Sequence, residues 1–578
     1  MKKLQKVSFL IFFGIFLPAF LFAQSVENNN DEIFPPFAER EEPPFFDDDE
    51  SSPFEEQNGF QDEDKSEIEN LENDSEPDSA KSINPDLQRN FNIAVGSWDW
   101  NLDPQTSSYS TEAQILSGLY EGLFSYHPST LEPVPAIAES YKISRDKKRW
   151  TFKIRENLKF SNGEEINAFT VRSNWISLLQ NKGAPYASLL DCIRNAEDFR
   201  NGKAPEDDLG IKARDNTTLV VTLKSPTAHF ARILCHHAFS ISRTSTGETA
   251  FSGAFKIGSQ EEKKLVLLKN ENYWDAENVH LPSITITASD DIAENSYKFN
   301  TGDYNWVSSM FDASKLINKN SIRLTAIFGT EYLFFGCKNK PWNLPEFRSA
   351  LMNAVPWEAL RKLSLMPATT FIYPLAGYPK VEGYSETSIE DAEEMLAEAR
   401  KNNGYSADEK IPLIFAVPAN SERQKKIAAL LEEAFKPLNV ELKVQTTPED
   451  RYVDSISGWN ADLFSYSWIG DFADPIAFLE LFRGGSTLNP THYNNEKFNK
   501  LLEDSALASD GTEHYKLLAQ AEQLLLDEGM VIPISHSLSF HAINLQEIGG
   551  WYVNALDIHP FKYLYFKEDK SELPDNVI

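Results

Sequence analysis

The residues best suited to chemistry are an acid and a tryptophan within the segment 463–479, LFSYSWIGDFADPIAFL. Its core reads WIGD and follows a short apolar run, and an Asp-Pro pair comes directly after it. An acid beside a Trp at the end of a strand can receive a cation in a partly dry cleft. A solvated loop acid or a helix N-cap is the plainer interpretation of these residues alone. We treat Asp471, with Trp468 and Gly470 beside it, as a candidate cation-binding site.

Signatures of catalysis and metal binding are missing from the sequence. It contains no GxSxG, HExxH, GxxxxGK[ST] or GxGxxG motif and no paired CxxC. The adjacent pair His236-His237 would point apart on a regular element, and His536 and His541 match no known ligand spacing. We therefore expect no catalytic residue, no metal ligand set and no cofactor. A catalytic constellation outside these motifs stays open.

The segments around Asp471 alternate between strands and helices. Strands are predicted at 411–417, 440–444 and 462–467, and a helix with an apolar stripe at 421–436 lies between the first two. This spacing requires a right-handed crossover between parallel strands. Ligands of open α/β sheets bind at the carboxyl ends of the strands, and Asp471 falls at such an end.

Further elements follow from periodicity and from turn residues. The first half predicts strands at 92–95, 150–155, 219–223, 255–257, 265–268 and 284–288, and helices at 111–124 and 168–179. In the second half, Thr387 and Glu390 suggest the capping box of a helix that ends at Asn403-Gly404. A helix at 512–527 and a strand at 531–534 come last, and Asp474 is expected to cap a helix that Pro475 opens.

The length and the net charge of the chain limit the number of domains and the classes of partner. A chain of 578 residues is long enough for about three or four domains. The formal net charge of −32 argues against nucleic-acid binding, which needs a basic surface. The charge is uneven, because residues 24–86 hold 22 acids against 3 basic residues. The rest of the chain is only mildly acidic.

The N-terminus is typical of an export signal. Lys2, Lys3 and Lys6 precede an apolar run at 9–22 that ends at Ala23. The run is shorter than the ~20 residues that span a bilayer. We predict a signal peptide at 1–23, with an uncleaved anchor as the alternative. No cysteine lies nearby to accept a lipid, so we expect a periplasmic protein without stable membrane insertion after processing.

Residues 24–86 are acidic, poor in aliphatics and predicted to be a disordered linker. Phe-Pro clusters recur in it about every ten residues, at 34–37, 43–46 and 53–54. Either the segment is a solvated spacer or it is a docking strip for a partner. The three cysteines, Cys192, Cys235 and Cys337, are expected to be buried thiols, although one disulfide stays open.

Several strings, in the same order, resemble the extracytoplasmic solute-binding proteins of the peptide/nickel class. They are LDP at 102–104, LYEGL at 119–123, PAIAESY at 135–141, WTFKIRENLKFSNG at 150–163, SGAFKI at 252–257, NYW at 272–274 and FRSAL at 347–351. The resemblance runs from about Phe91 to the C-terminus. Thr170, Pro356-Trp357 and the acidic tail depart from the family pattern.

The resemblance implies an α/β fold of two discontinuous lobes that close on a ligand by a hinge. The first lobe would comprise 87–335 and 530–578, with a smaller subdomain at about 136–244, and the second lobe 336–529. Such a protein captures short peptides and delivers them to the permease subunits of an ABC importer, and we expect a monomer.

The resemblance also implies roles for single residues. Asp471 would accept the α-ammonium of a peptide, with Trp468 as the adjacent wall. The segment Ser252, Gly253, Ala254 and Phe255 is the candidate strand edge for peptide backbone. The partner of the peptide carboxylate stays open, since neither Arg423 nor Arg451 can be assigned.

Other functions stay open from the sequence. The same fold binds other solutes, such as an oligosaccharide or a metal chelate. An envelope scaffold or adhesin that acts through the acidic Phe-Pro tail is a different class, and an exported peptidase is a third.

Overall fold

A computed structural model describes residues 89–96, 100–245, 248–419, 421–447, 452, 456–508 and 510–567. The predicted signal peptide and the acidic segment lie outside these residues. Within the described residues, no helix combines the length and the apolar character needed to cross a bilayer.

A ten-stranded mixed sheet runs through the whole molecule. In spatial order its strands are β10 (Phe255–Glu261), β11 (Lys264–Lys269), β12 (Ser283–Ala288), β1 (Phe91–Val95), β13 (Trp306–Ser308), β18 (Val531–Ile543), β14 (Ile322–Phe335), β17 (Leu463–Ile469), β15 (Ile411–Pro418) and β16 (Val440–Thr447). The predicted parallel pair is confirmed, because β15 and β16 pair in parallel over eight positions. β17 is parallel to β15 and antiparallel to β14.

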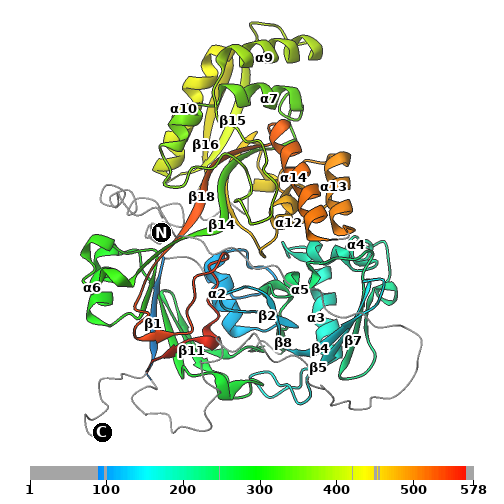
Figure 1. Ribbon diagram of the computed structural model, residues 1–578, viewed down its shortest axis with the longest axis vertical. Helices are drawn as coiled ribbons and strands as arrows, with labels where there is room; N and C mark the ends of the chain where they lie inside the picture. Colours follow the sequence, from blue (N-terminus) through cyan, green and yellow to red (C-terminus); the bar gives the residue numbers. More distant parts are fainter. Residues whose placement is uncertain are drawn as a thin grey trace, which may run out of the picture.

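The fold has two lobes, as expected (Figure 1). In the upper lobe, helices α7 (Pro345–Ala354), α9 (Ile389–Asn403) and α10 (Glu422–Phe435) lie around β15 and β16, with α13 (Glu496–Ala506) and α14 (Gly511–Asp527) beside them. The lower lobe holds α2 (Ser110–Leu119), α6 (Ile292–Thr301) and the strands from β10 to β13. The residue limits given above for the lobes stay a prediction.

A second, smaller sheet forms one side of the lower lobe (Figure 1). Its order is β4 (Ala138–Ile143), β5 (Arg149–Ile154), β7 (Thr218–Thr222) and β6 (Ile211–Ala213), all antiparallel. The other short elements are β2 (Phe124–Tyr126), β3 (Pro133–Pro135), β8 (Arg243–Ser245), β9 (Glu248–Ala250), β19 (Ile548–Gly549), β20 (Tyr565–Phe566), α3 (Ala168–Gln180), α4 (Ala196–Arg200), α5 (Phe230–Ile233), α8 (Trp357–Arg361) and α12 (Ile476–Leu479).

Strands β14 and β18 pass from one lobe to the other side by side (Figure 1). Their pairing is interrupted between the lobes. Ala326 lies opposite Leu538, but the next paired residue, Thr330, lies opposite His536. Three residues of β14 thus bulge against one residue of β18. At this bulge a Cβ on Gly329 would lie 2.8 Å from the hydroxyl of Ser537. A bulge bends a strand locally, so this position suits the hinge between the lobes.

Two of the strings that carry the family resemblance meet around one buried acid, Glu121. Its carboxylate accepts hydrogen bonds from the Tyr273 hydroxyl at 2.6 Å, the Trp274 indole at 2.6 Å and the Lys562 ammonium at 2.8 Å. Gly253 packs on the same region, since a Cβ there would lie 2.5 Å from the backbone of α2. These strings therefore hold the lower lobe together.

Some predicted element limits are wrong for identifiable reasons. The helix predicted at 111–124 ends at Leu119, because Tyr120 is extended and Glu121 turns into its buried cluster. The N-cap of α9 is Ser388, not Thr387, whose hydroxyl donates to the carbonyl of Val355 at 2.5 Å.

The last predicted strand is longer than expected. The prediction was 531–534, but β18 continues to Ile543 because its polar residues pair with β14 and then with β13. All three cysteines are free thiols; Cys235 is buried, and the other two are half-buried.

Candidate functional site

Asp471 lies two residues beyond the end of β17, as predicted from the alternation of strands and helices. The chain that leads to Asp471 is closely packed. Gly470 donates its backbone N–H to the carbonyl of Phe328 at 2.8 Å, and a Cβ on Gly470 would lie 2.5 Å from the Phe328 ring. Trp468 is buried, and its indole N–H donates to the carbonyl of Ala477 at 3.1 Å. Glycine is therefore required here, and the Trp ties β17 to α12.

The Asp471 side chain is buried where the two lobes meet. Tyr186 of the lower lobe donates a hydrogen bond to its carboxyl group, and Nε2 of His236 lies 3.7 Å from Oδ1. Tyr126 donates to the backbone carbonyl of Asp471 at 3.0 Å. Within the described part of the chain, Oδ2 has no hydrogen-bond partner.

The electrostatics of this position favour a cation that comes from outside. Burial raises the pKa of Asp471 well above 3.8, although the hydrogen bond from Tyr186 acts in the opposite direction. Burial, with His237 beside it, lowers the pKa of His236 well below 6.5, so this imidazole is neutral at pH 7. A cation next to the carboxyl would offset the desolvation of its charged form.

Asp471→Asn is expected to raise the thermal midpoint of the ligand-free protein. The raised pKa means that the folded state favours the neutral acid, so stability falls as the pH rises from 3.8 through the folded pKa. Asn is neutral throughout, so the gain should be absent at pH 4 and about 1–3 °C at pH 8. Calorimetry on ligand-stripped protein measures it, and a wild type that is at least as stable as the variant at pH 8 would contradict it.

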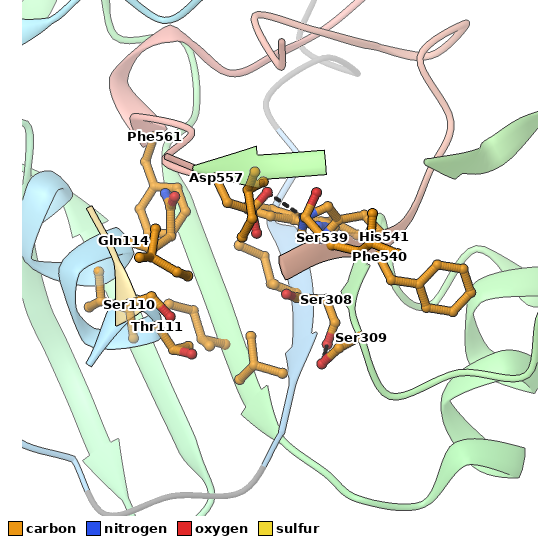
Figure 2. Close-up of a pocket in the computed structure, with 18 residues that line it drawn as sticks. Ser110, Thr111, Gln114, Ser308, Ser309, Ser539, Phe540, His541, Asp557 and Phe561 are labelled. Atoms are coloured by element: carbon orange, nitrogen blue, oxygen red, sulfur yellow. Dashed lines mark hydrogen bonds and ion pairs between the residues drawn. The ribbon is translucent and has the colours of Figure 1, made fainter. Parts of the chain in front are cut away.

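A pocket is lined by elements of the lower lobe and by the last residue of β17 (Figure 2). It holds about 760 Å³ of empty space, part of it open to solvent. The start of α2 contributes Ser110 and Thr111, β13 contributes Ser308, and β17 contributes Ile469, two residues before Asp471. Asp471 is not among the lining residues, but Ile469 joins the two places, so we treat the pocket and Asp471 as neighbouring parts of the candidate binding site.

The segment predicted as a strand edge for peptide lies inside the lower lobe. The hydroxyl of Ser252 accepts from the N–H of Glu121 at 2.9 Å and donates to the carbonyl of Ile241 at 2.5 Å. The carbonyls of Gly253 and Ala254 both accept from Asn270, at 2.8 Å each.

Within the same segment, Phe255 is fully buried and begins β10, the outer strand of the large sheet. Peptide pairing along this segment stays a prediction.

One candidate for the peptide carboxylate already has a partner. Arg423 binds Glu331 through Nη2 at 2.7 Å and through Nε at 2.9 Å. Arg451 lies outside the described residues. The partner of the carboxylate remains open.

The sequence did not reveal Tyr126, Tyr186 and His236 as neighbours of Asp471. All three come from the other lobe, far away in the chain, and no local pattern reports such contacts. The adjacent histidines at 236–237 are a local signal, but their spacing does not indicate a neighbouring acid.

Several known proteins are similar to this chain in sequence. Residues 132–490 match the model of the bacterial extracellular solute-binding proteins, family 5. The dipeptide-binding protein DppE of Bacillus subtilis is 26% identical over 497 residues, covering 81% of this chain and 89% of its own. The oligopeptide-binding protein OppA of the same organism is 28% identical, covering 77% and 87%.

Among solved structures, Haemophilus influenzae OppA in complex with the peptide RPPGFSPFR superposes with a TM-score of 0.72. It is 22% identical in sequence and covers 83% of this chain and 100% of its own. This likeness shows that the two chains share a fold.

Proposed function

Because this chain belongs to the bacterial extracellular solute-binding proteins, family 5, we propose that it captures short peptides between its lobes and delivers them to an ATP-driven importer. The observation that carries the proposal is the buried Asp471 carboxyl group with an unpartnered oxygen. A free peptide brings an α-ammonium group, a cation with several N–H donors. The names of the dipeptide- and oligopeptide-binding relatives support the same class of solute.

Asp471 accepts the α-ammonium in this proposal. The ion pair forms in a place where burial disfavours a lone carboxylate, so cation and acid stabilise each other. Trp468 forms the adjacent wall, and its fixed indole keeps the end of β17 in place. Gly470 allows the sharp approach of the chain to Phe328.

The peptide backbone would pair with strand edges beside this acid. β17 continues from Ser465 to Ile469 past its last pairing with β15, at Phe464. This stretch leads directly to Asp471, which favours strand addition there. The segment 252–255 stays the second candidate edge. Because this pairing uses the peptide backbone and not the side chains, it lets the protein accept many peptide sequences.

The setting of the protein is part of the proposal. We infer a periplasmic, monomeric and non-catalytic protein whose partners are the permease subunits of the importer. The export signal predicted at 1–23, the family match and the missing nucleophile and metal motifs support this.

Acetylation of the peptide N-terminus tests the proposal without changing the protein. Trialanine and Nα-acetyl-trialanine are titrated into ligand-stripped protein by calorimetry, together with a pool of tri- to pentapeptides read by native mass spectrometry. Free peptides are expected to bind at least about 100-fold more tightly, because acetylation leaves Asp471 buried without its cation.

Equal affinities for the free and the acetylated peptide would overturn the ammonium assignment. If instead native mass spectrometry finds a co-purified oligosaccharide or metal chelate, and no peptide of the pool binds, the solute class is wrong.

A further inference from the structure

A second group of side chains joins the two lobes, and peptide capture does not use it. It consists of His229, at the N-cap of α5 in the lower lobe, with Asp474 and His514 from the upper lobe. One potential ligand atom from each lies within 4.8 Å of the other two. All three side chains are buried. Asp474 also accepts from the N–H of Ile476 at 3.0 Å, as predicted for the start of this helix.

The contacts of His514 place two hydrogen-bond acceptors opposite each other, its Nε2 and the carboxylate of Asp474, with no proton between them in the neutral ring. Its Nδ1 lies 2.9 Å from the carbonyl of Ser505, which only accepts, so Nδ1 carries the ring proton. Nε2 of the neutral ring then presents a lone pair. Yet Nε2 lies 3.1 and 3.2 Å from the two carboxylate oxygens of Asp474. Either a second proton or a metal cation must lie between the ring and the acid.

His229 supplies a third donor from the opposite lobe. Within the described residues its Nδ1 is buried and has no hydrogen-bond partner. The ring stacks on Phe472 with centroids 5.6 Å apart and planes 9° apart, which fixes its orientation. A histidine ring nitrogen held in this way can act as a metal ligand.

We propose that His229, Asp474 and His514 bind a divalent transition-metal ion of the Zn²⁺ type, which joins the two lobes. Two imidazoles and one carboxylate match the ligand preference of Zn²⁺, and water or a further ligand would complete a tetrahedron. Ligand atoms in such a site lie about 3.4 Å apart, so small side-chain rotations suffice. The carbonyl of Ser505 fixes the tautomer of His514, as outer-shell partners of metal-bound histidines do.

The surrounding charges permit a cation here. The two arginines that act on His229, Arg232 and Arg483, are each paired with an acid. Arg232 binds Glu132 at 3.1 Å, and Arg483 binds Glu480 at 2.8 Å. Their charges are thus largely compensated within the protein.

A similar group in the lower lobe differs in its hydrogen bonds. The indole of Trp306 donates to Nδ1 of His541 at 3.2 Å, so the ring proton of His541 is on Nε2. Nε2 donates it to Asp557 at 2.8 Å, and His559 reaches the same oxygen at 3.2 Å (Figure 2 shows Asp557 and His541). Both histidines can donate an Nε2–H to Asp557, so no further cation is needed between ring and acid, although Nδ1 of His559 is buried without a partner among the described residues. The group therefore serves as a control for the contact between His514 and Asp474.

A metal ion bound by His229, Asp474 and His514 would favour the closed arrangement of the lobes. Its ligands come from both lobes, and Asp474 is three residues from Asp471. The consequence for peptide release rests on the proposed function, whereas metal binding does not. By linkage, the ion and the peptide would raise each other's affinity by the same factor.

Zinc titration of peptide-free protein tests the inference. Full-length, tag-free protein is unfolded, treated with a chelator, refolded and titrated with ZnSO₄ by calorimetry, with elemental analysis for stoichiometry. We expect one Zn²⁺ per chain and a thermal midpoint that rises with zinc concentration. His229→Gln and His514→Gln should weaken binding by more than the roughly 10–100-fold caused by loss of an outer-shell partner.

His559→Gln is the control and should bind as the wild type does. His229→Gln removes no hydrogen bond of Nδ1, so it should fold normally, which circular dichroism without metal verifies. Small-angle scattering should show that zinc compacts the wild type and not His229→Gln. The absence of stoichiometric zinc, wild-type affinity in His229→Gln, or loss of binding in His559→Gln would each overturn the site. Because no peptide is present, these outcomes do not depend on the proposed function.

Discussion

Asp471→Ala is expected to weaken peptide binding by about two to three and a half orders of magnitude while the protein stays folded. Removing one partner of a buried ion pair costs about 3–5 kcal/mol, because the other charge is left desolvated. In the variant, the ammonium would face Tyr186 and a neutral His236. Calorimetric titration of trialanine into ligand-stripped protein measures the change.

The acetylated peptide provides the control for Asp471→Ala. It lacks the ammonium, so its affinity should be the same for both proteins, and the double comparison isolates the ion pair. An affinity for trialanine within threefold of the wild type would rule out Asp471 as the ammonium acceptor.

Glu121→Ala is expected to destabilise the protein by about 3–5 kcal/mol, because it leaves a buried ammonium unpaired. Glu121 is the common acceptor for Lys562, Tyr273 and Trp274, and all four groups are partly or fully enclosed. Denaturant unfolding followed by tryptophan fluorescence measures the change, and Trp274 is a local reporter.

The double variant Glu121→Gln, Lys562→Met separates charge from packing. It removes both charges and keeps similar volumes, so it should recover much of the stability lost in Glu121→Ala. A loss below about 1 kcal/mol in Glu121→Ala would show that water or another group compensates Lys562.

Local pattern was enough to predict the strands that lead to Asp471. Strand β15, helix α10 and strand β16 follow the expected order, and their parallel pairing fixes which end of the sheet carries the acid. Periodicity reports which face of an element is buried, and this information is local. The position of Asp471 beyond the carboxyl end of its strand was therefore predictable from the sequence.

The surroundings of Asp471 could not be predicted in the same way. Tyr186 and His236 belong to the other lobe, and their position beside Asp471 depends on how the two lobes pack together. The group of His229, Asp474 and His514 could not be predicted for the same reason. His229 and Asp474 are more than 200 residues apart and lie in no shared motif. β18 also extends beyond its predicted end, because most of its polar Ser and His residues are buried although they interrupt the apolar pattern.

The shared sheet has a consequence for the way the protein melts. β18 places Ile532 and Ile534 in the apolar cluster of the upper lobe and Ile543 in that of the lower lobe. β14 likewise passes through both lobes. Neither lobe can unfold without pulling two central strands out of the other, so the described body is expected to melt in one cooperative transition. Any molecule held between the lobes then stabilises the whole body, not one half of it.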